Sequence, residues 1–347
     1  MDIIKNLLVV GAGASYAECL ELGLCEDQCL PTIKNFISKL WKTGYPINSE
    51  NLILFLAANN FIKDYPELIE KKDPYEILSM LELADSTNVE KLFSFLWERD
   101  QKYPTVMANG LTMFESVLHH GIIRPLCEFI LFNILDNKEI IDKHDFIEIL
   151  HNIPFPKLSL ASKMGNFLKA NDFVMSLNYD TLFEISLDQI NKKFNYVGFG
   201  ACSSDKINII KPHGSINFFI NKKENKYWYS PTLFNTVLPS HNDSNYSSIM
   251  APRLNKQFNQ HHLSEIIINS IPFKYPVHLI FWGIGFTESD CDLNLLYKKW
   301  VKGSRKISFI NPDAEVAYKF KRDIGGNVFQ YKSVDDFLEN NGEKIII

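Results

Sequence analysis

The first fifteen residues join an apolar run to a pair of glycines. Residues 3–10 are rich in branched apolar side chains, and Gly-Ala-Gly-Ala-Ser follows at 11–15, ahead of a segment suited to a helix. This order predicts a strand, a tight turn and a helix, whose N-terminus offers unpaired N–H groups and about half a positive charge. A turn of this kind suits the binding of a pyrophosphate.

The glycine motif is shorter than the dinucleotide fingerprint G-x-G-x-x-G, because Tyr16 stands where the third glycine would fall. Two interpretations of Gly11 and Gly13 therefore stay open. Either their backbone approaches a bound phosphate closely, or they serve a purely structural turn.

The rest of the chain divides into two patterns. Short, almost continuous apolar runs predict strands that are covered on both faces, as in a parallel sheet, and they lie at 173–177, 207–210, 277–282, 307–310 and 328–331. Between about 32 and 165 the apolar residues recur at helical spacing instead. The clearest helix is predicted to begin at Thr87, with Glu90 completing a capping box.

These patterns predict a single α/β domain over residues 1–347. Its core is a Rossmann-like, doubly wound parallel sheet built from 1–31 and 166–347, and 32–165 form an inserted, mostly helical subdomain. Residues 220–250 lack any periodicity and are rich in Asn, Ser, Tyr and Lys, so we expect a long loop there.

Composition excludes several classes of protein. Lys and Arg total 36 against 41 acidic residues, a net charge of −5, so we expect neither direct nucleic-acid binding nor capture by an anionic membrane. No apolar run is long enough to span a bilayer. The six cysteines form no C-x-x-C pair, which argues against a structural zinc site, and we expect no metal. Few cysteines and no secretory leader in the first ten residues together predict a cytoplasmic protein.

Polar side chains follow two of the predicted strands directly. Asn178 offers a donor and an acceptor that match a carboxamide such as nicotinamide, whereas Asp180 is suited equally to a ligand or to capping the next helix. His213 lies after the run at 207–210 and beside a glycine, where it could transfer a proton near pH 7. Because ligands of doubly wound sheets bind at the carboxyl ends of strands, these residues are candidates for an active site.

Two further strand ends carry weaker signals. Gly283 and Gly285 follow the run at 277–282 and would let the backbone approach a ligand. Asn311 follows 307–310 and could bond ribose hydroxyls. Ordinary turn chemistry is the alternative for all three.

Five motifs taken in order resemble a sirtuin-like domain: GAGAS at 11–15, SLNYDTLFE at 176–184, KPHGSINF at 211–218, WGIGF at 282–286 and INPD at 310–313. The resemblance is closest to the bacterial branch found in antiphage defence, whose members commonly hydrolyse NAD. It implies that Asn178 and Asp180 hold the nicotinamide end and position water, and that His213 is the catalytic base. It further implies that the pyrophosphate is held by Gly11, Ala12, Gly13 and Ser15. Gly283 and Gly285 would line the cofactor cleft, and Asn311 would contact the adenosine ribose.

The resemblance predicts an NAD+ glycohydrolase that releases nicotinamide and ADP-ribose. Such a hydrolase would be the effector of antiviral defence by abortive infection, acting as a homo-oligomer or with a partner such as a HerA-type ATPase. The four-cysteine zinc module of deacylating sirtuins is absent from the sequence, which argues against peptide deacylation. Two alternatives stay open, a catalytically silent sensor of NAD or ADP-ribose and a zinc-free protein deacylase or ADP-ribosyltransferase.

Overall fold

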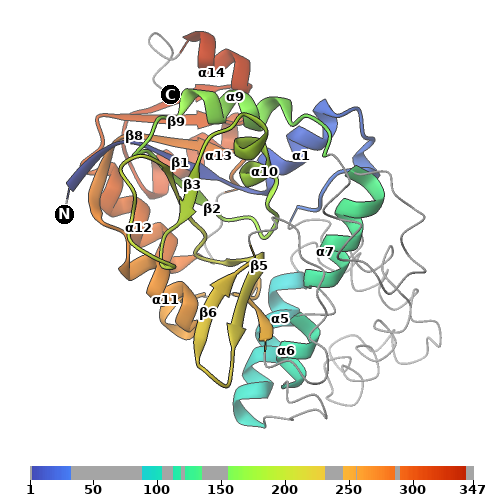
Figure 1. The fold of residues 1–347 in the computed structure, drawn as a ribbon. Coiled ribbons are helices and arrows are strands. Elements are labelled where there is room, and N and C mark those ends of the chain that lie inside the picture. The colour runs from blue at the N-terminus through green and yellow to red at the C-terminus, as the bar shows by residue number, and fades with distance from the viewer. Residues whose placement is uncertain are drawn as a thin grey trace.

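A seven-stranded, all-parallel sheet with the order β10-β9-β8-β1-β2-β4-β3 forms the core of the protein (Figure 1). The computed structural model describes residues 2–32, 88–103, 112–118, 122–134, 155–230, 245–254, 256–285 and 290–340. The strands are β1 (Asp2–Val10), β2 (Phe173–Ser176), β3 (Phe194–Tyr196), β4 (Ile207–Ile210), β8 (Phe273–Trp282), β9 (Lys306–Ile310) and β10 (Val328–Tyr331). All five later runs predicted as strands are strands of this sheet.

Helices cover the sheet on both faces. One layer contains α1 (Ala12–Glu21), α9 (Ser159–Phe167), α10 (Leu182–Gln189) and α14 (Val334–Asn340), since α9 contacts each of the other three. The connections from β8 to β9 and from β9 to β10 run in the opposite direction along the sheet, through α12 (Cys291–Val301) and α13 (Ala314–Asp323). Right-handed crossovers of opposite direction place helices on opposite faces, so the sheet is doubly wound and the predicted fold class is confirmed at this level.

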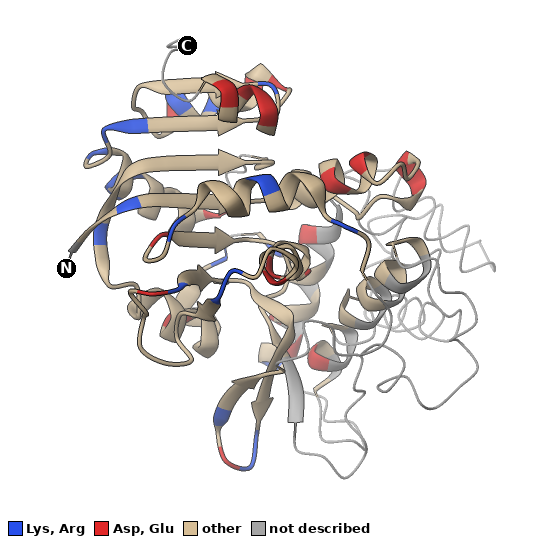
Figure 2. Ribbon diagram, turned by 45° about the horizontal axis from the view of Figure 1, so that its top comes forward, with Lys and Arg blue, Asp and Glu red and all other residues tan. Residues whose placement is uncertain are grey.

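Strand β1 lies at the centre of the sheet, paired along its length with β8 on one side and over Leu7–Val10 with β2 on the other. The side chains of Leu7, Leu8 and Val9 are completely buried, as the continuous apolar run predicts. Lys, Arg, Asp and Glu lie mainly on helices, loops and strand ends (Figure 2). The direction of chain progression reverses at β1, which makes the carboxyl edge there the switch point at which doubly wound sheets bind ligands.

A second, antiparallel sheet contains β5 (Gly214–Asn221), β6 (Lys226–Tyr229) and β7 (Asn245–Ile249) in the order β6-β5-β7. The loop predicted for 220–250 is therefore wrong in its described parts, while 231–244 lie outside the described residues. A four-residue turn with Asn225 at φ +49° closes the β5–β6 hairpin. Phe219 stacks on Trp228 at 4.7 Å across it. Cross-strand aromatic pairs of this kind stabilise a hairpin, although the two strands show too little alternation to be recognised in advance.

The described part of 32–134 after residue 32 is helical, with α5 (Asn88–Lys102), α6 (Met113–Leu118) and α7 (Arg124–Phe129), which continues as a π-helical turn (Ile130–Ile134). Phe93 and Leu96 are three residues apart and lie on one face of α5, where both are buried. Thr87, the predicted cap, lies outside the described residues. Helix α9 also falls almost entirely within the range assigned to the insertion, but it packs in the helix layer of the main sheet. Among the described helices, none combines the length and the apolar character needed to cross a bilayer.

Helices α1 and α9 are joined by a buried carboxylate. The residue before α9, Leu158, provides no side-chain cap, and the N–H groups of Leu160 and Ala161 donate instead to the carboxylate of Glu18 on α1, at 3.3 and 2.7 Å. Glu18 is 1% exposed, so these two bonds replace the water that its carboxylate loses. The contact fixes the two helices that begin and end the connection from β1 to β2.

We expect Glu18→Ala to lower the free energy of unfolding by roughly 2 kcal/mol, because two helix N–H groups lose their acceptor in a buried place. Glu21→Ala, which changes an exposed residue on the same helix, serves as the control. Denaturant unfolding of both variants measures the difference. If Glu18→Ala is as stable as Glu21→Ala, water satisfies the N–H groups at the start of α9 as effectively as the Glu18 carboxylate does.

Candidate active site

The turn after β1 is in direct backbone contact with the turn after β8. Gly11 N donates to Trp282 O at 3.0 Å, and Gly13 N donates to Gly283 O at 2.8 Å. A Cβ on Gly11 would lie 2.7 Å from Gly283 O, and one on Gly283, whose φ is +63°, would lie 2.0 Å from Ala14 N. These glycines therefore have a structural role, and two of the turn's N–H groups are already used. Of the described residues, none accepts from the N–H of Ala12 at the start of α1, so this group remains available to an anion.

Asn178, Asp180 and Ser15 meet beside this turn. The amide nitrogen of Asn178 donates to Gly11 O at 3.1 Å and to Ser15 Oγ at 2.9 Å, and Ser15 Oγ donates to Asp180 Oδ2 at 2.9 Å. The other oxygen of Asp180 accepts from Leu182 N, at the start of α10. Burial raises the pKa of Asp180, against the effect of the nearby Lys211 cation. The hydrogen bonds of Asp180 and Ser15 are directed inward, whereas Oδ1 of Asn178 accepts none from the described residues and is available to a ligand.

His213 lies against the residue that precedes Asn178. Its Nδ1 is 3.4 Å from Leu177 O, and because a carbonyl only accepts, this contact assigns the proton to Nδ1 and leaves Nε2 as a lone-pair acceptor. The side chain is buried at 5% exposure. Burial lowers the pKa of His213 to about 4, helped by Lys256 and opposed by Asp290. The imidazole is thus neutral at physiological pH, which is the state that a general base requires.

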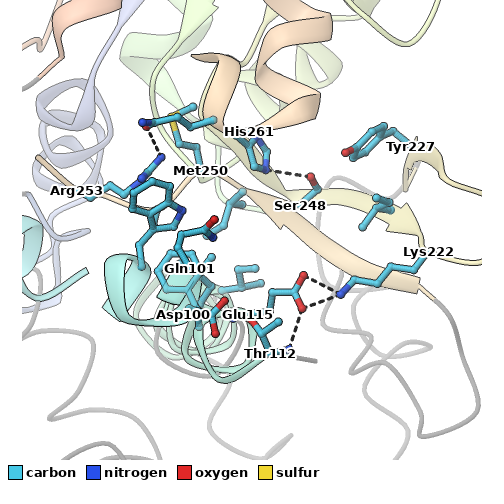
Figure 3. Close-up of a pocket in the computed structure, with 18 residues that line it drawn as sticks. Asp100, Gln101, Thr112, Glu115, Lys222, Tyr227, Ser248, Met250, Arg253 and His261 are labelled. Carbon is cyan, nitrogen blue, oxygen red and sulfur yellow. Dashed lines mark hydrogen bonds and ion pairs between the residues drawn. The ribbon is translucent and has the colours of Figure 1, made fainter. Parts of the chain in front are cut away.

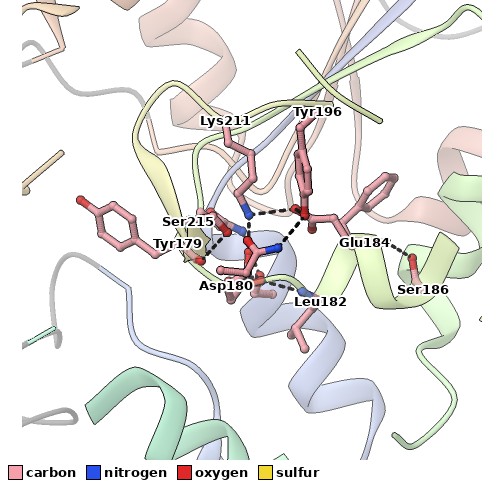
Figure 4. A network of polar contacts seen from close by, with 12 residues as sticks. Tyr179, Asp180, Leu182, Glu184, Ser186, Tyr196, Lys211 and Ser215 are labelled. Carbon is pink, nitrogen blue, oxygen red and sulfur yellow. Dashed lines mark hydrogen bonds and ion pairs between the residues drawn. The ribbon is translucent and has the colours of Figure 1, made fainter. Parts of the chain in front are cut away.

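A buried ion pair supports the loop that carries Asn178 and Asp180 (Figure 4). Lys211 Nζ lies 2.9 Å from Glu184 Oε1 and donates to Asp180 O at 2.5 Å. The hydroxyl of Tyr196 donates to the same Glu184 oxygen at 3.4 Å. Lys211 and Glu184 are almost completely buried, so the loss of either one would leave an uncompensated charge in the interior. Both residues lie in the sequence motifs that also contain the candidate site residues, but the sequence analysis assigned them no role.

Two further charged residues lie on the other side of His213. Asp290 Oδ1 is 3.9 Å from His213 Nε2, and Lys256 Nζ is 2.8 Å from the same Asp290 oxygen. Asp290 occupies the N-cap position of α12 but makes no side-chain capping bond. An acidic residue at a helix start is ordinarily assigned to capping, which is why its place beside His213 could not be anticipated.

The strand ends of β8 and β9 join the same edge of the sheet. Asn311 donates from Nδ2 to Ile284 O at 3.2 Å, and its Oδ1 accepts from Asp313 N at 2.9 Å, so its amide supports the turn after β8. Gly285 has no described atom within 4 Å of the place where a Cβ would stand. Asn311 is therefore engaged within the fold, and Gly285 borders open space.

A separate cavity of about 350 Å³ lies between α5, α6 and the antiparallel sheet (Figure 3). Its lining includes Arg253, whose guanidinium is 4.0 Å from the centre of the Trp97 ring, and the ion pair of Lys222 with Glu115. Met250, which also lines it, donates its N–H to His213 O at 2.8 Å. The cavity thus adjoins the backbone of His213 without containing any predicted site residue. Within the described ranges, no three or more His, Cys, Asp or Glu side chains gather as a metal site.

Two buried histidines, His213 and His278, and the partly buried His261 predict the response of stability to acid. Burial lowers the pKa of His213 and His261 to about 4 and that of His278 to about 3, below the value near 6.5 of an unfolded histidine. The unfolded chain therefore binds protons first as the pH falls below about 6.5, and stability falls until about pH 4. Thermal unfolding between pH 7.5 and 4.5 measures this loss, on the order of 3 kcal/mol for each histidine.

The free energy of unfolding of His278→Gln should depend less steeply on pH, because a glutamine amide does not bind a proton in this range in either the folded or the unfolded chain. His262→Gln, which replaces an exposed histidine, is the control for the substitution itself. Parallel curves for wild type and His278→Gln would contradict the prediction.

Comparison of the chain with protein-family models and with curated proteins gave no match. The function must therefore be argued from the geometry of the site.

Proposed function

We propose that the chain is an NAD+ glycohydrolase, which cleaves NAD+ to nicotinamide and ADP-ribose. The observation that carries the proposal is the junction of three strand ends at the switch point. Asn178, after β2, bonds Gly11 O after β1, while His213, after β4, bonds Leu177 O. An amide acceptor, a neutral imidazole and a helix N-terminus thus adjoin one another, which is the set of groups that this reaction needs.

Each group has a part in the proposed reaction. Ala12 N–H and the positive end of α1 bind the pyrophosphate, and Gly285 borders the cofactor cleft. Oδ1 of Asn178 accepts from the carboxamide of nicotinamide. Ser15 and Asp180 are positioning residues, since their bonds hold the Asn178 amide. Gly11, Gly13, Gly283 and Asn311 fix the backbone turns around the ligand.

The bond between nicotinamide and ribose breaks with its electron pair going to the pyridinium nitrogen, which becomes neutral. Water then forms the new bond to the sugar carbon, through an oxocarbenium-like state, and its proton passes to Nε2 of His213. The lowered pKa of His213, near 4, keeps this nitrogen unprotonated at neutral pH. Orientation of the sugar and of the water supplies most of the acceleration, because nicotinamide is already a good leaving group.

The biological role extends this proposal. An enzyme that consumes NAD+ without restraint would harm its own cell, so activity would depend on self-assembly or on a partner such as a HerA-type ATPase. The likeness of the five sequence motifs to the antiphage branch of sirtuin-like proteins supports an effector of abortive infection.

A sensor that binds NAD+ or ADP-ribose without cleaving it is the second candidate. The observation that favours it is the deep burial of His213, which is 5% exposed and lies near Asp290. In a sensor the imidazole would be a packing residue, and only the glycine turns and Asn178 would meet the ligand.

We expect His213→Gln and Asn178→Ala each to reduce NAD+ cleavage by about a hundredfold or more, because each removes a polar contact used in the transition state. Chromatography of NAD+, nicotinamide and ADP-ribose measures turnover, with bound nucleotide quantified in the same samples. His262→Gln, an exposed histidine, is the control for substitution itself.

Cleavage retained by either folded variant would remove that residue from the catalytic assignment. Binding by the wild-type protein without cleavage, also when it is assembled with its partner, would support the sensor. Absence of binding would refute both candidates.

A further inference from the structure

One face of α5 holds the segment that carries Lys256. Arg253 stacks on Trp97 at 4.0 Å, and the N–H of Leu254 donates to Ser94 Oγ at 2.9 Å. Lys256 Nζ lies 3.8 Å from Glu90 Oε1. Positions 90, 94 and 97 are spaced four and three residues apart and therefore lie on one face of the helix. The segment thus runs antiparallel to α5 and contacts it over two turns.

The same lysine reaches the candidate base. From α5 to the imidazole the charges alternate in the order Glu90, Lys256, Asp290, His213, with separations of 3.8, 2.8 and 3.9 Å. Glu90, Lys256 and His213 are buried. A buried ammonium group needs partners, and Lys256 has one on α5, Glu90, besides the nearer carboxylate of Asp290, so α5 contributes to the position of Lys256.

We propose that α5 tunes the proton affinity of His213 through the chain Glu90–Lys256–Asp290. With α5 in the observed position, Lys256 offsets the charge of Asp290 beside the imidazole. A displacement of α5 would withdraw Lys256, and Asp290 would then raise the proton affinity of His213, which moves the acid limit of activity to higher pH. The coupling concerns His213 itself, and its effect on catalysis rests on the proposed NAD+ hydrolysis.

The charges around His213 determine the direction of this effect. Lys256 lowers the pKa of His213 and Asp290 raises it, while burial has the largest effect. Two groups packed nearby are neutral at pH 7, because burial lowers the pKa of His261 to about 4 and raises that of Tyr179 far above its usual value, and the buried cation Arg253 beside them is the same in every variant. Loss of Lys256 must therefore raise the pKa of His213, and loss of Asp290 must lower it.

The first test measures protonation of His213 directly, from the ¹⁵N shifts of labelled histidine between pH 4.5 and 7.5, with His213→Gln identifying the signal. We expect Lys256→Gln to raise the pKa of His213 by about one unit or more, since a cation is removed from a desolvated place. Asp290→Asn should leave the imidazole neutral throughout this range. The double variant should return toward wild type, and Lys256→Arg, which keeps the charge, should resemble wild type. An unchanged pKa in a folded Lys256→Gln protein would overturn the proposal.

The second test asks whether α5 controls the lysine. Ser94→Ala combined with Trp97→Leu removes two of the three contacts to the segment and leaves every charge of the chain in place. We expect the His213 pKa to rise in this variant, in the same direction as in Lys256→Gln. Glu98→Gln, an exposed acid on the same helix, is the matched control and should leave it unchanged. An unchanged His213 pKa in the variant with Ser94→Ala and Trp97→Leu would show that α5 does not act on His213.

Activity separates this inference from the proposed function. If the protein cleaves NAD+, the acid limb of its kcat/KM profile should move to higher pH in Lys256→Gln, with about a tenfold loss for each pH unit below the new pKa. Movement of the NMR-detected pKa, with no NAD+ cleavage by wild type even when it is assembled with its partner, would uphold the coupling and refute the hydrolase. NAD+ cleavage by wild type, with neither the NMR-detected pKa nor the acid limb moved in Lys256→Gln, would uphold the hydrolase and refute the coupling.

Discussion

The backbone contact between the turns after β1 and β8 is the constraint on which the rest of the site depends. Gly11 and Gly13 donate to carbonyls of β8 residues and of the turn that follows them, at distances that leave no room for a Cβ. This contact fixes the first turn of α1 and therefore the place of Ser15, to which Asn178 is bonded. One turn later the same helix presents Glu18 to the start of α9. A side chain at Gly283 would displace the whole of this arrangement.

Buried charge provides the second level of organisation. A lysine–carboxylate pair in the interior gives little net stability, because the desolvation of both ions offsets their attraction. Its geometric effect is larger, since a lost partner leaves an isolated buried charge. Lys211 with Glu184 fixes the loop between β2 and α10, and Lys256 with Asp290 borders the opposite side of His213. The imidazole of His213 thus lies between the Leu177 carbonyl and Asp290, on segments far apart in the sequence.

The sequence predicted those features that depend on local order. Continuous apolar runs identified the strands of the main sheet, and periodicity identified the buried face of α5. The β5–β6 hairpin was missed because β6 has only four residues and the aromatic residues stand on both faces. Glu90 was assigned to a capping box, yet its carboxylate lies toward Lys256, far along the chain. Likewise, the motif Gly-Ala-Gly could not reveal that its N–H groups donate to β8, because that contact joins positions more than 250 residues apart.

The central place of β1 has a consequence for how the chain is made. Its nine residues are synthesised before those of the other strands of the sheet, and its neighbours begin at Phe173 and Phe273. At about 5–20 residues per second, β1 waits many seconds for its first partner and longer for its second. Both of its hydrogen-bonding edges are unpaired during that time, and such edges recruit other chains. The order of the strands thus leaves β1 open to wrong pairing until β8, in the last third of the chain, has emerged.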